Sequence, residues 1–279
     1  MLAKIVESYK SFLSVKYESH YKLFCNRLGD KPEGARAEAV TFSWLRSQFE
    51  EVTIAEDVVT GGADFLCVSG NDKIIVEVTC AESEAVSTQS YLPNRVPENG
   101  SGGSFRMITH KLRTKASEKA SQLSDYRMPR VLAITCEHVA ADVLLGPLGA
   151  EMLLTSDPKI RVPIATGKSI DERIYMTTDL KDSVFFRFNK GTVEPCRQSI
   201  SAIFLISILA DKLLVVGILH PQPRHVLTIS MLPLVPFLRI KKWPPENHRI
   251  ETEWVIHSPK PAAFYHQEIT FNEKELRSI

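Results

Sequence analysis

The stretch from Ala63 to Cys80 constrains the fold more than any other, because it contains two apolar, strand-like runs joined by a short turn at residues 69–72. Two such runs around a turn of small and polar residues are typical of a β-hairpin. Asp64 opens the first run and Glu77 lies near the end of the second. Neighbouring strand ends in a hairpin lie close together, so the pattern predicts that two carboxylates meet on one side of a sheet.

The alternation of side chains in the second run indicates whether Glu77 is buried. Successive side chains of a strand point to opposite faces, so Ile75, Glu77 and Thr79 share one face while the other face is apolar throughout. Such a pattern is typical of a central strand that is covered on both sides. Burying an ionised carboxylate without a partner is costly, and a bound divalent cation is one remedy. The alternative is that both acids stand at strand ends and face solvent or an arginine.

Composition sets the broad class of the protein. The chain has 279 residues, enough to bury a substantial core, and its formal net charge of +1 excludes a broadly basic nucleic-acid coat but not a local basic patch. Five scattered cysteines without a Cys-x-x-Cys pair, together with an N-terminus that lacks a secretory signal pattern, predict a cytoplasmic protein with reduced thiols. The most apolar window, residues 200–219, is interrupted by charged residues, so we expect no membrane contact.

Helical periodicity appears twice before the hairpin. Residues 2–28 are predicted to form a helix that covers the core, and residues 34–49 are predicted to form a second helix. Glu38 falls in the middle of the apolar stripe of this second helix, where an acid needs a partner or a ligand. The alternative is that the start of the helix is frayed and that Glu38 favours the positive end of the helix dipole.

A third helix is predicted over residues 105–124, after the hairpin. Lys119 projects within its apolar face, and Lys115 and Gln122 lie on the flank of that face. Because lysine is rarely buried without a partner, Lys119 is a candidate site residue. The alternative is that its aliphatic stem lets the ammonium group reach the solvent.

The other segments are predicted to complete one sheet. Residues 52–59 are expected to form a strand before the hairpin. Residues 130–136 are expected to form a strand after the third helix, and because a helical crossover precedes it, this strand would add to the sheet in parallel. The polar, glycine-rich residues 81–104 are predicted to form a long loop. Residues 199–209 and 213–220 are predicted to form a second hairpin that extends the same sheet.

This order of elements, with Glu38 on a helix and Asp64 and Glu77 on two following strands, resembles the core of the PD-(D/E)XK nuclease superfamily. The segment Ala63-Asp64 stands where its motif has proline and aspartate, and Glu77-Val78-Thr79 stands for its E-x-K element, with threonine in place of lysine. The resemblance implies an α/β, restriction-endonuclease-like αβββαβ core with a mixed central sheet over residues 31–137. A cover helix would occupy residues 1–30, and residues 138–279 would form a C-terminal extension packed on the same sheet.

The resemblance also implies a metal-dependent nuclease that hydrolyses phosphodiester bonds, in DNA in preference to RNA. Asp64, Glu77 and the backbone carbonyl of Val78 would hold Mg²⁺ or Mn²⁺, and Glu38 would complete the site directly or through water. The lysine migrates to the following helix in some members of this superfamily, which points to Lys119 as the catalytic lysine. The secondary candidates are Thr79, Lys115 and Gln122.

Other interpretations remain open at this level. Thr79, in place of the motif lysine, favours a catalytically inactive module with the nuclease fold that binds nucleic acid or a protein partner. A toxin or defence effector restrained by a protein partner is a third interpretation. Many nucleases of this fold act as dimers, so the resemblance also allows a homodimer.

Overall fold

The computed structural model describes residues 2–90, 104–123, 126–156, 159–161, 175–177, 180, 183–209, 212–245 and 250–256. The helices are α1 (Leu2–Lys16), α2 (Glu18–Asp30), α3 (Pro32–Gln48), α4 (Ser83–Ser90), α5 (Ser104–Gln122), α6 (Ala141–Leu144) and α7 (Pro147–Thr155), with a 3-10 turn η1 (Ile229–Met231). The strands are β1 (Glu51–Ile54), β2 (Phe65–Ser69), β3 (Asp72–Cys80), β4 (Arg130–Cys136), β5 (Lys159–Arg161), β6 (Tyr175–Thr177), β7 (Phe186–Asn189), β8 (Thr192–Pro195), β9 (Ala202–Leu209), β10 (Lys212–Leu219), β11 (Phe237–Ile240) and β12 (Thr252–Val255).

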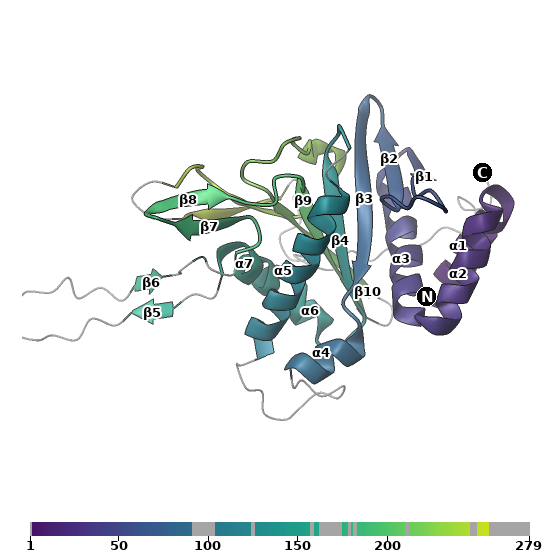
Figure 1. The fold of residues 1–279 in the computed structure, drawn as a ribbon, viewed down its shortest axis with the longest axis horizontal. Helices are drawn as coiled ribbons and strands as arrows, with labels where there is room; N and C mark the ends of the chain where they lie inside the picture. Colours follow the sequence, from purple (N-terminus) through teal and green to yellow (C-terminus); the bar gives the residue numbers. More distant parts are fainter. Residues whose placement is uncertain are drawn as a thin grey trace, which may run out of the picture.

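The fold is α/β and is organised around a mixed sheet of eight strands in the order β1-β2-β3-β4-β9-β10-β11-β12 (Figure 1). The predicted hairpin is confirmed, because β2 and β3 are antiparallel with Phe65 opposite Val76. The predicted parallel addition is also confirmed, because β4 runs parallel to β3 with Leu132 opposite Glu77. The hairpin of β9 and β10 joins β4 on its other side and so extends the same sheet.

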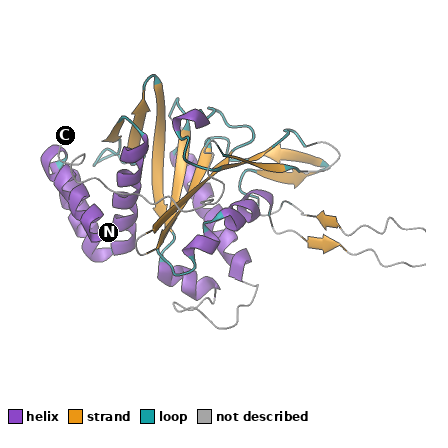
Figure 2. Cartoon of the chain, turned by 180° about the vertical axis from the view of Figure 1, so that it is seen from behind, coloured by secondary structure: helices purple, strands orange, loops and turns teal. Residues whose placement is uncertain are grey.

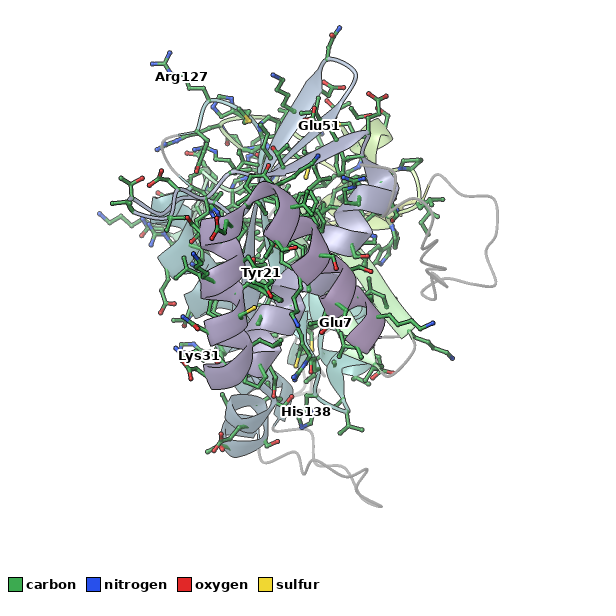
Figure 3. All side chains as sticks on the ribbon, turned by 90° about the vertical axis from the view of Figure 1, so that its right-hand side faces the viewer. Glu7, Tyr21, Lys31, Glu51, Arg127 and His138 are labelled. Atoms are coloured by element: carbon green, nitrogen blue, oxygen red, sulfur yellow. The ribbon has the colours of Figure 1, made fainter. Side chains whose placement is uncertain are left out.

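Two hydrophobic cores cover the two faces of this sheet, and the alternation of β3 decides which residue enters which core. Ile74 and Val76 pack with α1, α2 and α3, whereas Ile75 packs with α5, α6 and α7. The sheet therefore lies between two helical layers, as Figures 1 and 2 show from opposite sides. In Figure 3, which looks onto the first layer, Glu7 and Tyr21 mark α1 and α2 as its outer helices.

The N-terminal region differs from the prediction. Residues 1–30 were expected to form one cover helix, but the chain breaks at Tyr17, where φ is −142° and ψ is 62°. The Tyr17 ring packs 5.5 Å from that of Phe12, centroid to centroid, so a tertiary contact accompanies the break. The resulting helical hairpin of α1 and α2 packs against α3, and this places two helices rather than one over Glu38.

Two local predictions after α3 also need correction. The strand predicted over residues 52–59 ends at Ile54, because the Asp57 side chain accepts hydrogen bonds from the backbone N–H groups of Val59 and Thr60 and turns the chain. The loop predicted over residues 81–104 contains α4, whose first N–H group donates to the Glu33 carboxylate at 2.7 Å. Residues 91–103 of that loop lie outside the described residues.

Two further observations concern the class of protein. The five cysteines are free in the structure. Among the helices of the described part of the chain, none has both the length and the apolar character needed to cross a membrane.

Candidate functional site

The hairpin of β2 and β3 places Asp64 and Glu77 as cross-strand neighbours. Phe65 pairs with Val76, and extending that register by one residue puts Asp64 opposite Glu77. The Asp64 carboxylate is also fixed by the backbone, because its Oδ2 accepts a hydrogen bond of 2.6 Å from the N–H group of Val78. Asp64 thus stands directly before β2, near enough to Glu77 for the charge of Glu77 to raise its pKa.

Helix α5 brings two lysines to the same face of β3. Lys119 Nζ lies 2.6 Å from Glu77 Oε1, and Lys115 Nζ donates to Thr79 Oγ1 at 3.3 Å. Glu77 is 4% exposed, and its second oxygen, Oε2, is buried without a hydrogen-bond partner among the described residues. Gln122 belongs to α5, and its side chain lies outside the described residues.

Glu38 comes from the helical layer on the other face of the sheet. It is buried, as its position in the apolar stripe predicts, and both of its oxygens have partners. Tyr9 Oη donates to Oε1 at 2.7 Å, and Arg27 Nη2 lies 2.8 Å from Oε2. The split of the N-terminal region into α1 and α2 supplies these two contacts, one from each helix. In the described structure Glu38 is thus engaged by the N-terminal hairpin.

The three acids share one electrostatic environment. Burial raises the pKa of Asp64 well above its ordinary value, and the negative charges of Glu77 and Glu38 raise it further. Burial also raises the pKa of Glu77, with Lys119 acting in the opposite direction. The pKa of Glu38 is raised by burial and lowered in part by Arg27. The negative charge of the three buried acids is therefore only partly compensated by the two cations of the site, Lys119 and Arg27.

Glu56 belongs to this environment and was not found by sequence reasoning. It follows β1 in an irregular segment, and its negative charge contributes to the raised pKa values of Asp64, Glu77 and Glu38. Its backbone carbonyl oxygen lies 2.9 Å from Nε2 of His20 on α2. An acid in an irregular segment has no periodic pattern that marks it, so only the tertiary structure reveals it.

Tyr126 is a second residue that sequence reasoning missed. Its hydroxyl oxygen accepts a hydrogen bond of 2.9 Å from the N–H group of Ala63, directly before Asp64. Gly62 has φ at +139°, and a Cβ atom there would lie 2.9 Å from the same hydroxyl. Tyr126 therefore fixes the turn that positions Asp64, and Gly62 leaves the space for it.

The arrangement joins some predicted residues more closely than others. Glu77 of β3 contacts Lys119 of α5 and lies near Asp64, which directly precedes β2, and Thr79 with Lys115 forms the next contact along. Among the residues that the structure describes, no group of three or more His, Cys, Asp or Glu side chains is arranged to hold a metal ion. A site for a cation would therefore use two carboxylates with backbone and water oxygens, a ligand set that suits Mg²⁺.

Comparisons with known proteins add no identity: no family model, no curated protein and no solved structure matches the chain. Any proposal for the function of this chain therefore rests on the chemistry of the site.

Proposed function

We propose that this chain is a metal-dependent nuclease that hydrolyses phosphodiester bonds, with DNA as the substrate in preference to RNA. The observation that carries the proposal is that Glu77 lies near both Lys119 and Asp64, which directly precedes β2, while one buried oxygen of Glu77 has no hydrogen-bond partner among the described residues. Two carboxylates and a lysine are the groups that this reaction needs for charge stabilisation around a phosphate.

The order of elements supports the same proposal. Helix α3 precedes the antiparallel meander of β1, β2 and β3, and α5 leads from the meander to β4, which is parallel to β3. Apart from the inserted α4, this order agrees with the αβββαβ arrangement of the restriction-endonuclease-like core. Fold alone does not define a reaction, so the proposal depends on the side chains.

The residues present fit a hard divalent cation. Mg²⁺ is usually bound through one or two carboxylates and retains water molecules that a substrate phosphate can replace. Asp64, Glu77 and the carbonyl oxygen of Val78 would hold Mg²⁺ or Mn²⁺, and Glu38 would act through water, because Tyr9 and Arg27 already engage its oxygens. A bound cation would also relieve the mutual repulsion that raises the pKa of Asp64. When bound, such a metal lowers the pKa of a water ligand and neutralises charge that develops on the phosphate.

The chain's own groups have separate tasks in this mechanism. The N–H group of Val78 orients the Asp64 carboxylate, and the Tyr126 hydroxyl fixes the turn before it. Burial raises the pKa of Glu77, and the positive charge of Lys119 opposes that rise and so favours the ionised form. The Lys119 ammonium would then donate a hydrogen bond to the attacking water or to a phosphate oxygen.

Cleavage assays test the proposal. Circular and linear DNA are incubated with Mg²⁺, Mn²⁺ or EDTA, and the Asp64→Asn and Glu77→Gln variants are compared with Asp72→Asn, an exposed acid at the other end of β3. We expect metal-dependent cleavage that falls at least about 100-fold in the first two variants and is unchanged in the third. Cleavage that persists in both site variants, or in EDTA, would contradict the proposal.

A second candidate function is a catalytically inactive module of the same fold that binds nucleic acid or a protein partner, including within a defence or toxin system. A specific observation favours it, because Glu77 is already paired with Lys119 and Glu38 with Arg27. Thr79, in place of the motif lysine, agrees with this interpretation. A titration with Mn²⁺ separates the two functions, since an inactive module of this kind needs no binding that depends on Asp64 and Glu77.

A further inference from the structure

Helix α5 carries three lysines at intervals of four residues: Lys111, Lys115 and Lys119. Side chains four residues apart lie on one side of a helix and about 6 Å apart along its axis. The three lysines therefore form a row, which borders the buried stripe made by Leu112 and Ala116. All three are half-buried, so the row lies along the edge of the contact between α5 and the sheet, where solvent still reaches it.

The spacing of the lysines along α5 matches the spacing of side chains on one face of β3. Side chains two residues apart on a strand share a face and lie about 6.6 Å apart, close to one turn of helix. Lys119 contacts Glu77 at 2.6 Å, and one turn back Lys115 contacts Thr79 at 3.3 Å. One further turn back, Lys111 lies beyond the last of these contacts, towards the end of β3. The row thus leads from the end of β3 towards the two carboxylates.

Charge along the row is uneven. Lys119 is neutralised by Glu77, whereas Thr79 offers Lys115 only a neutral hydroxyl. Within the described ranges, neither Lys111 nor Lys115 takes part in an ion pair. Burial lowers the pKa of Lys111, the charge of Lys115 lowers it further, and Glu82 acts in the opposite direction. Lys111 and Lys115 are thus two neighbouring, half-buried cations without carboxylate partners. Such a pair favours the binding of anionic groups that are spaced as the two lysines are.

We propose that Lys111 and Lys115 bind successive phosphates of one polynucleotide strand and lead it to Asp64 and Glu77. This inference rests on the proposed function, and it adds the path of the substrate and two residues that hold it. Lysine binds phosphate as a point charge, so the contacts are independent of base sequence. The third lysine of the row then stands at the phosphate that would be cleaved.

Binding without cleavage tests the row directly. The full chain is titrated into a fluorescent 20-nucleotide single-stranded DNA in EDTA, between about 50 and 200 mM salt, and anisotropy gives the affinity. The variants are Lys111→Gln and Lys115→Gln, with Lys115→Arg to retain the charge. The matched control is Lys4→Gln, which removes an exposed lysine from α1 in the opposite helical layer.

Each of the two glutamine variants is expected to weaken binding and to reduce the slope of log affinity against log salt by about 0.7, the value for one phosphate contact in a single strand. Lys115→Arg is expected to keep the wild-type slope, and Lys4→Gln is expected to have no effect. Wild-type affinity and slope in both glutamine variants would overturn the inference. An equal loss in Lys4→Gln would also overturn it, because the effect would then be one of net charge.

Cleavage with Mn²⁺, measured separately, distinguishes this inference from the nuclease proposal. If the wild type cleaves DNA while the glutamine variants bind as the wild type does, the row is wrong and the nuclease proposal stands. If the variants lose binding while the wild type does not cleave, the row stands and the chain is a binding module. Thermal unfolding of each variant shows that a loss of binding does not come from a loss of structure.

Discussion

Replacing Lys119 with methionine removes the cation beside Glu77 while retaining a long aliphatic side chain. The pair is 2.6 Å apart, with the Lys119 side chain 27% exposed and the Glu77 side chain 5% exposed. Breaking a fully buried pair by removing one partner costs about 3–5 kcal/mol. Because Lys119 is partly solvated, we expect a smaller loss of about 2–3 kcal/mol in the free energy of unfolding at pH 8.

The dependence of this loss on pH follows from the pKa of Glu77. Burial raises that pKa and Lys119 lowers it, so the variant should have a Glu77 pKa that is higher still. A carboxyl group with a raised pKa in the folded state stabilises the fold below its unfolded pKa, and this contribution is lost as the pH rises through the folded pKa. The cost of Lys119→Met should therefore be larger at pH 8 than at pH 5.

Urea unfolding followed by circular dichroism measures both values. The control is the Lys119→Met/Glu77→Gln double variant, in which no charge is left unpaired at this contact. We expect the double variant to recover at least about 1 kcal/mol at pH 8, because the two residues are in direct contact. An equal loss at both pH values, together with no recovery in the double variant, would refute the electrostatic account of this pair.

Two further predictions concern stability. Asp64→Asn should raise the free energy of unfolding at pH 8 and have less effect towards pH 5, because the raised pKa of Asp64 makes its stabilising contribution vanish as the pH rises; a destabilised variant at pH 8 would contradict this. Gly217→Ala should destabilise the protein by about 1–3 kcal/mol in urea unfolding, because a Cβ atom would lie 2.3 Å from the ring of Phe237. Gly29→Ala in α2, with no atom within 4 Å of its Cβ position, is the control and should stabilise by about 0.5–1 kcal/mol.

The sheet around the site could be predicted because it follows simple periods. The alternation of β3 defines its two faces and so the face that carries Glu77. Strand β4 is mostly apolar and is buried at all seven positions, Arg130 and Thr135 included. The apolar stripe of α3 likewise predicts that Glu38 is buried. In these elements local pattern and tertiary packing agree, so the sequence is sufficient.

Other parts of the site depend on contacts between distant residues, which no local pattern shows. Tyr9 lies 29 positions from Glu38, and Tyr126 lies 63 positions from Ala63. Strand β11 follows directly after Pro236, and proline is unfavourable in a central strand, yet β11 pairs with both β10 and β12. Its backbone partners on two sides outweigh the local preference that the prolines indicate.

The central claim is that Asp64 and Glu77 together bind a divalent cation. Calorimetric titration of the protein with Mn²⁺ in the absence of DNA tests it most directly, with Asp64→Asn, Glu77→Gln and the exposed control Asp72→Asn alongside. The account predicts a binding event in the wild type and the control that is lost in both site variants. Equal binding in all four proteins, or no binding in the wild type, would contradict the claim.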